Sequence, residues 1–131
     1  MTTAAEAIVI GGGVMGASIL YSLSSKGIKN SILLERATVG SGSTGRSSGA
    51  IRMHYSTEVN ARLAFESLKV FANFDEIVGG DVGFVETGYM VLAPDHAREG
   101  FQDNIEMQKA VGIDTRVVSL DEARELAPAF L

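Results

Sequence analysis

The sequence contains no cysteine, which excludes disulfide bonds, thiolate metal sites and a cysteine nucleophile. The same absence suits a reducing compartment, and we expect a cytoplasmic protein without a bound metal. Aromatic residues are also scarce, at 7% of 131 residues, whereas the chain has 15 glycines. This combination favours an α/β protein with tight turns over a small β-sandwich.

Positive charge and long apolar runs are lacking too. The chain has 11 Lys and Arg residues against 16 Asp and Glu residues, and no segment is strongly basic, so we expect no nucleic-acid partner. The N-terminal residues carry no positive charge ahead of an apolar stretch, and four glycines interrupt the apolar run from Ala7 to Leu23. These patterns predict neither a signal peptide nor a membrane span.

The first part of the chain has the pattern of a strand, a helix and a second strand. Ala7 to Ile10 is a short apolar run rich in β-branched residues, which fits a strand buried on both faces. A helix is predicted from about Val14 to Lys26, with Gly27 as its stop, and Ser31 to Glu35 reads as a second buried strand. Because a single helix with short loops connects them, the two strands are predicted to be parallel neighbours joined by a right-handed crossover.

Between the first strand and the helix, Gly11, Gly13 and Gly16 form the motif G-x-G-x-x-G. The first glycine permits a sharp turn, the second leaves room for a pyrophosphate, and the third lets helix and strand pack closely. Glu35 ends the second strand, where a carboxylate can accept both hydroxyls of an adenosine ribose; the alternative is an exposed strand-end charge. The arrangement predicts a dinucleotide site, but the motif alone does not separate FAD from NAD.

A loop of glycine and serine, residues 40–49, follows the second strand. Its composition is also that of a flexible linker, but its position at the strand end favours a nucleotide site. An NAD site has little use for such a loop, whereas the ribityl chain and second phosphate of FAD would extend over it. We therefore expect FAD.

The remainder of the chain is predicted to contain three helices, a hairpin and one short strand. In order these are a helix from Ser56 or Thr57 to about Val78, a hairpin over Gly83 to Leu92, a helix from Asp95 to Val111, a strand from Thr115 to Val118, and a helix begun by a capping box at Ser119 and Glu122 and stopped by Pro128. The pattern changes after Gly79-Gly80, which predicts a domain boundary near residue 80.

Three motifs, residues 11–16, 34–36 and 40–49, together resemble the FAD-dependent D-amino acid oxidase superfamily. Through residues 50–56 and 62–68 the sequence is most similar to sarcosine oxidase β-subunit-like amine oxidoreductases. The resemblance implies an α/β fold: an incomplete Rossmann-type FAD-binding βαβ unit in residues 1–80, then the start of an α+β substrate domain in residues 81–131. It implies oxidation of an amine such as sarcosine, glycine or another amino acid, by hydride transfer to flavin N5 and hydrolysis of the imine.

For the ADP end of the cofactor, the resemblance assigns roles to four positions besides the glycines. Val14 and Met15 would offer backbone groups to the diphosphate. Glu35 would hold the adenosine ribose, and Arg36 would lie near the adenine.

For the flavin end, the resemblance assigns roles to the loop. Ser43 and Thr44 would contact phosphate or ribityl oxygens. Ser48, Gly49 and Ala50 would run beside the flavin ring. Arg46 has two interpretations, either assistance with negative charge or bracing of the loop.

Arg52 is the substrate-side candidate, because an arginine in the matching Ile-Arg-x-x-Tyr stretch of simpler amine oxidases binds the substrate carboxylate. A guanidinium suits a planar anion, and the alternative is a structural salt bridge. His54 has three interpretations, as a packing residue, a covalent flavin attachment point or a general base.

Members of the resembled family are several-fold longer than this chain, and later strands complete their FAD-binding sheet. We therefore expect an N-terminal fragment, a truncated gene product or one piece of a split enzyme, completed by another polypeptide or a missing C-terminal segment. The isolated chain is expected not to turn over, and the full assembly to be the enzyme. Two alternatives are an NAD-dependent dehydrogenase domain and a non-catalytic ADP- or FAD-binding subunit of a split or multi-subunit enzyme.

Overall fold

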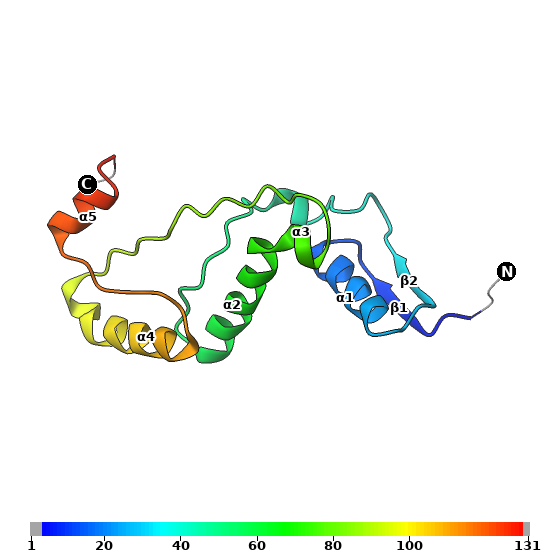
Figure 1. The fold of residues 1–131 in the computed structure, drawn as a ribbon, viewed down its shortest axis with the longest axis horizontal. Helices are drawn as coiled ribbons and strands as arrows, with labels where there is room; N and C mark the ends of the chain where they lie inside the picture. Colours follow the sequence, from blue (N-terminus) through cyan, green and yellow to red (C-terminus); the bar gives the residue numbers. More distant parts are fainter. Residues whose placement is uncertain (1–3, 130–131) are drawn as a thin grey trace. The chain divides into compact units, whose positions relative to one another are not determined.

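The structure is a computed structural model that describes residues 4–129. The chain forms two compact units, divided between Ala50 and Ile51. The elements are coloured along the chain in Figure 1 and are, in order, β1 (Ala7–Ile10), α1 (Val14–Ser25), β2 (Ser31–Leu34), η1 (Thr44–Arg46), α2 (Glu58–Ala72), α3 (Phe74–Ile77), η2 (Asp95–Ala97), α4 (Arg98–Val111) and α5 (Leu120–Leu126).

The first unit contains the predicted βαβ arrangement. Strands β1 and β2 are parallel neighbours, in a register that pairs Val9 with Leu33 and Ile10 with Leu34. Helix α1 connects them and contacts both strands (Figure 1). It ends where predicted, since Gly27 adopts a positive φ of 95° and donates its amide to Ser24. The predicted fold class is therefore confirmed, with a parallel β1-α1-β2 unit typical of the start of a Rossmann FAD-binding domain.

Apolar residues of the sheet are exposed in this unit. Val9 is buried, but Ile10 keeps 86% of its surface exposed and Leu34 keeps 51%. Two strands and one helix do not supply enough layers to cover a sheet that is apolar on both faces. The two-stranded sheet therefore keeps apolar side chains exposed at its surface.

The second unit is built around the contact between α2 and α4. Ala61 of α2 and Ile105 of α4 are buried there, and the Phe65 ring lies 3.4 Å from the position a Cβ would take on Gly112. Gly112 ends α4 in the left-handed conformation that glycine adopts at low cost. Gln108 is also buried, with 1% of its surface exposed.

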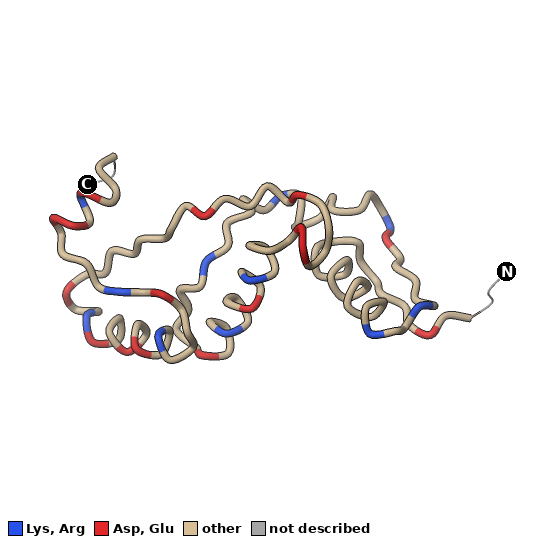
Figure 2. The backbone as a smooth tube through the Cα atoms, viewed as in Figure 1, with Lys and Arg blue, Asp and Glu red and all other residues tan. Residues whose placement is uncertain are grey.

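Charged residues of both signs lie along α2 and α4 (Figure 2). Glu58 and Arg62 form an ion pair within α2 at 2.6 Å, as do Glu66 and Lys69. Pairs at these spacings stabilise solvent-exposed helix faces by a few tenths of a kcal/mol each, roughly. None of the helices within residues 4–129 is both long and apolar enough to cross a bilayer.

The helix predicted to run to Val78 is wrong in one respect, because it breaks at Asn73. This residue has non-helical backbone angles of −121° and 38°, and its side-chain amide donates to the Lys69 carbonyl at 2.8 Å. An asparagine that bonds its own preceding turn competes with continuation of the helix. The helix therefore divides into α2 and α3.

The predicted hairpin over Gly83 to Leu92 is not formed, and Thr115 to Val118 is not a strand. Both segments are extended between helices without pairing to another strand (Figure 1). Val85 and Val117 are exposed rather than packed, at 73% and 59%. An isolated pair of strands is marginal in water, and within residues 4–129 neither segment pairs with another strand.

Candidate functional site

The glycine turn after β1 is tight because two backbone groups approach closely. Gly11 has a φ of 106°, in the region that favours glycine, and donates its amide to the Leu34 carbonyl at 2.8 Å. A Cβ on Gly16 would lie 1.8 Å from the carbonyl oxygen of Gly11. Only a residue without a side chain fits that point of α1, so strand and helix meet at backbone distance.

Glu35 follows β2 and joins its carboxylate to this turn. Its Oε2 accepts from the amide of Gly12 at 2.7 Å, and its Oε1 accepts from the amide of Ala37 at 2.8 Å. The Gly12 hydrogen bond, followed by that from Ala37, lowers the pKa of Glu35 below its ordinary value. Each carboxylate oxygen has a second lone-pair site, so the group can still accept hydroxyl donors.

Gly12 is a functional position that the motif reading missed. Its amide holds Glu35, and its carbonyl accepts from the amide of Gly40 at 2.9 Å. A Cβ on Gly12 would lie 3.1 Å from the Cβ of Glu35. The signal in the sequence was the middle glycine of Gly11-Gly12-Gly13, at a position where the G-x-G-x-x-G motif allows any residue.

The loop of residues 40–49 is folded onto the glycine turn rather than extended as a linker. Besides the bond from Gly40 to Gly12, the hydroxyl oxygen of Thr44 accepts from the amide of Val14 at 2.9 Å. Gly45 donates to Gly40 at 2.8 Å, and a Cβ on Gly45 would lie 2.6 Å from that carbonyl oxygen. The hydrogen bonds therefore attach the loop to the first amide of α1.

The residues around this turn fit a dinucleotide phosphate. Helix α1 begins at Val14 without a side-chain cap from Gly13 and without an acidic residue in its first turn. Unpaired amides at such a helix end attract an anion, and the helix dipole adds to the attraction. The Thr44 hydroxyl accepts from an amide there and keeps its own proton for donation to an oxygen.

The first unit thus brings together the turn, the strand-end acid and the loop. The other predicted cofactor positions are at the surface of the same unit. Met15 is 70% exposed in the first turn of α1, Gly49 has a positive φ of 70°, and these further residues are exposed: Arg36, Ser43, Ser48 and Ala50. Their assignment to the cofactor remains a prediction.

Arg52 lies in the second unit and contacts two tyrosines. Its Nη1 donates to the Tyr89 hydroxyl at 3.3 Å, and its guanidinium carbon lies 5.5 Å from the centre of the Tyr55 ring. Tyr89, and after it Tyr55, raise the pKa of Arg52 above its ordinary value. None of the ion pairs within residues 4–129 includes Arg52, so the structure does not contain the alternative salt bridge.

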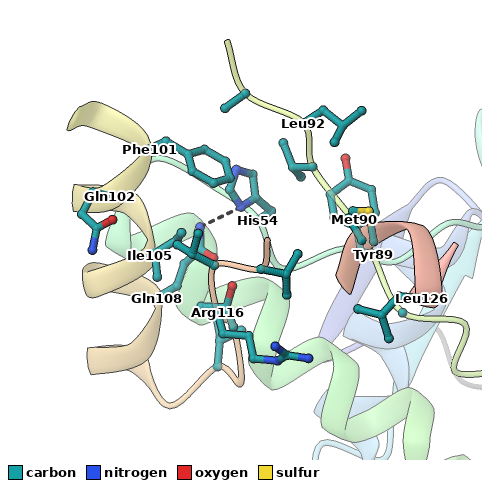
Figure 3. Close-up of a pocket in the computed structure, with 18 of the residues that line it drawn as sticks. His54, Tyr89, Met90, Leu92, Phe101, Gln102, Ile105, Gln108, Arg116 and Leu126 are labelled. Atoms are coloured by element: carbon teal, nitrogen blue, oxygen red, sulfur yellow. Dashed lines mark hydrogen bonds between the residues drawn. The ribbon is translucent and has the colours of Figure 1, made fainter. Parts of the chain in front are cut away.

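His54 is half-buried and packs against its neighbours. Its Nδ1 is 3.2 Å from Nε2 of Gln108, and its ring centre lies 5.4 Å from that of Phe101. The side chains of His54, Tyr89 and Phe101 line a cavity of about 800 Å³ within the second unit (Figure 3). Across residues 4–129, no group of three or more His, Asp and Glu residues is placed to hold a metal ion.

The chain belongs to the FAD-dependent oxidoreductase family designated DAO, whose family model matches residues 6–131. The resemblance inferred from the three motifs is thereby confirmed. Because the family is FAD-dependent, the interpretation as an NAD-dependent dehydrogenase domain is not retained.

Two curated relatives illustrate the range of the family. The chain is 30% identical over 125 residues to the mitochondrial pyruvate dehydrogenase phosphatase regulatory subunit of Mus musculus. The aligned region covers 95% of this chain and 14% of that protein. It is 28% identical over 130 residues to mitochondrial sarcosine dehydrogenase of Homo sapiens, and that aligned region covers 98% of this chain and 14% of that protein.

The fold also matches a solved structure, the crystal structure of L-proline dehydrogenase from P. horikoshii, with a TM-score of 0.77 and 28% sequence identity. The match covers 98% of this chain and 34% of the solved chain. The chain therefore spans about one seventh of the two curated relatives and about a third of the solved one.

Proposed function

We propose that the protein containing this chain is an FAD-dependent oxidoreductase that oxidises an amine such as sarcosine, glycine or another amino acid. The observation that carries the proposal is the hydrogen-bonded turn, in which Glu35, Thr44 and the start of α1 meet around Gly12. Relatives named sarcosine dehydrogenase and L-proline dehydrogenase support an amine substrate. When bound, FAD supplies the acceptor for the hydride that leaves the carbon next to the nitrogen.

The first unit would bind the cofactor. Val14 and Met15 would offer backbone groups to the diphosphate, and because the Val14 amide donates to the Thr44 hydroxyl oxygen, Met15 would supply the amide. Glu35 would accept from the ribose hydroxyls while it holds the turn. The Thr44 hydroxyl would donate to a phosphate or ribityl oxygen, as would Ser43. Arg36 would lie near the adenine, and residues 48–50 would run beside the flavin ring.

Arg52 would bind a substrate carboxylate. Its positive charge is not neutralised by an acid in the described part of the chain, and its two tyrosine partners leave most of its N–H donors free. A guanidinium offers two parallel donors to a carboxylate, which favours amino acids over simple amines.

The competent enzyme would need protein beyond these residues, from a further segment or another polypeptide. The exposed apolar face of β1 and β2 supports this, as does the small share of the relatives that the chain spans. In that complete protein, residues 1–80 would begin the FAD-binding domain and residues 81–131 the substrate domain. We propose a cytoplasmic location on the absence of cysteine alone.

The experiment is a titration of the flavin-stripped complete protein with FAD, followed by flavin fluorescence. Glu35→Ala should raise the Kd for FAD about tenfold or more, because hydrogen bonds to a charged group contribute about 1.5–3 kcal/mol. Glu6→Ala is the matched control in the same unit and should leave the Kd unchanged. An unaltered Kd in Glu35→Ala would refute the ribose assignment.

A second function is favoured by one observation, namely that a relative of 30% identity is named a regulatory subunit. The chain could then belong to a non-catalytic subunit that binds FAD or ADP. Anaerobic mixing of the flavin-loaded protein with sarcosine, glycine or proline separates the two functions. Bleaching of the flavin absorbance supports the oxidoreductase, and its absence with every amine supports the binding subunit.

A further inference from the structure

We propose that Tyr89 and Tyr55 hold the Arg52 guanidinium by direct contact, that Gln108 anchors the segment through the Tyr55 carbonyl, and that the Tyr89 hydroxyl is a second donor to the carboxylate that Arg52 binds. The inference rests on the proposed role of Arg52. It adds Tyr89 and Gln108, which sequence motifs do not single out, and gives a role to Tyr55, the tyrosine of the Ile-Arg-x-x-Tyr stretch. The ligand proposed for Arg52 and Tyr89 is a carboxylate.

The partners of Arg52 distinguish it from other arginines of the same unit. Arg62, Arg116 and Arg124 each lie against a carboxylate of the chain. Arg52 instead contacts a phenol oxygen and the face of a ring, both of which are neutral. These contacts fix the guanidinium plane and leave its charge available to an external anion.

Tyr89 is placed to donate to the same anion. Its oxygen already accepts from Arg52 at 3.3 Å, and a phenol that accepts a hydrogen bond still has its own proton to donate. The side chain is 59% exposed and lines the cavity, with its ring centre 6.5 Å from that of His54 (Figure 3). A carboxylate held by Arg52 would therefore meet a second donor on the residue that Arg52 touches.

Gln108 fixes the segment that carries Arg52. Its amide nitrogen donates to the Tyr55 carbonyl at 3.1 Å and to Nδ1 of His54 at 3.2 Å. The Tyr55 carbonyl is only an acceptor, so it sets the orientation of the amide, because a flipped amide would bring two oxygens together. Both hydrogen bonds come from a side chain that is 1% exposed on α4, which anchors residues 54 and 55.

The same orientation decides the tautomer of His54. Since the Gln108 amide uses an N–H toward Nδ1, that ring nitrogen is the acceptor and the proton of the neutral ring is on Nε2. In this tautomer the Nδ1 lone pair accepts from Gln108 and Nε2 carries the ring proton. His54 is thus a packing and anchoring residue, and its interpretation as a general base is set aside.

The test uses acetate as the probe and acetamide as its neutral control, with binding to the complete protein followed by saturation-transfer NMR. Acetate should bind saturably and acetamide should not. Tyr89→Phe keeps the ring and should weaken acetate binding about tenfold, as expected for a hydrogen bond to a charged group. Tyr21→Phe, a tyrosine of the first unit, should leave it unchanged. Acetate affinity in Tyr89→Phe equal to that of the parent protein would overturn the role of Tyr89.

Arg52→Lys separates this inference from the proposed function. If that variant binds acetate as tightly as the parent, the assignment of Arg52 itself fails. If it weakens binding but Tyr89→Phe does not, only the Tyr89 part of the inference fails.

Gln108→Met, of similar volume, tests the anchor. It should weaken acetate binding several-fold while circular dichroism stays unchanged. Nitrogen NMR of labelled His54, assigned with His54→Asn, should show the proton on Nε2 in the parent protein and a mixture of tautomers in Gln108→Met. A parent ring with its proton on Nδ1 would refute the role of Gln108, and so would a folded Gln108→Met that binds acetate normally.

Discussion

The carboxylate of Glu35 accepts a hydrogen bond from the amide of Gly12 at 2.7 Å, so the end of β2 is joined directly to the turn that follows β1. The same carboxylate is the group proposed to bind the adenosine ribose. Turn geometry and cofactor affinity therefore depend on one side chain. Its second hydrogen bond, from the Ala37 amide, fixes the other carboxylate oxygen.

The first prediction concerns pH. The lowered pKa of Glu35 in the folded chain means that its ionised form stabilises the fold above the unfolded value of about 4.5. This contribution should be lost as the pH falls below that value and through the lowered folded pKa. Amide shifts of Gly12 and Ala37 in an NMR titration should move together in acid. In Glu35→Gln this acid transition should be missing; if it persists, another group causes it.

The second prediction concerns Gly16. Gly16→Ala places a Cβ at 1.8 Å from the Gly11 carbonyl oxygen, and backbone must move to admit it. We expect a loss of at least about 1–3 kcal/mol in the free energy of unfolding. Gly42→Ala is the matched control, because no atom lies within 4 Å of its added Cβ and its φ is not positive. Equal stability of the two variants in urea unfolding would contradict the close approach.

The third prediction concerns Thr44. Thr44→Val retains the shape of the side chain but removes the acceptor of the Val14 amide. We expect the unfolding free energy to fall by about 0.5–1.5 kcal/mol and the Kd for FAD to rise. Thr38→Val, in the residues just before the loop, serves as the control. Hydrogen exchange at the Val14 amide should accelerate only in Thr44→Val, and unchanged exchange there would exclude this bond.

The fourth prediction concerns the start of α5. Ser119 accepts from the Glu122 amide at 3.2 Å, which is half of the predicted capping box. The Glu122 carboxylate pairs with Arg116 instead of returning to the Ser119 amide. Ser119→Ala should cost about 0.5–2 kcal/mol and loosen α5. Thr57→Ala is the control, since Thr57 caps α2 without a side-chain bond. Hydrogen exchange of the α5 amides should accelerate in Ser119→Ala and stay unchanged in Thr57→Ala.

The βαβ unit could be predicted from the sequence because its signals are local. Apolar runs, helical spacing and glycine stops define β1, α1 and β2, and the three elements together span only 28 residues, Ala7–Leu34. The hairpin could not be predicted correctly, since strand pairing depends on partners that the segment itself does not contain. The break at Asn73 depends on a single side-chain hydrogen bond, which periodicity does not detect.

The candidate site was predicted in part. Motif spacing indicated the outer glycines and Glu35, because each has a defined place relative to a strand end. Gly12 and Gln108 were missed, since their roles depend on hydrogen bonds to residues 23 and 54 positions away. Such long-range pairs leave no period in the sequence.

The absence of any side chain at Gly16 has a consequence for how the gene can vary. Every missense change of a glycine codon adds at least a Cβ, and that carbon would fall at 1.8 Å from the carbonyl oxygen of Gly11. No conservative replacement exists at this position, because even the smallest substitution, alanine, introduces the clash. In a library of random variants, we expect codon 16 to tolerate synonymous changes alone, whereas codon 42 should accept several amino acids.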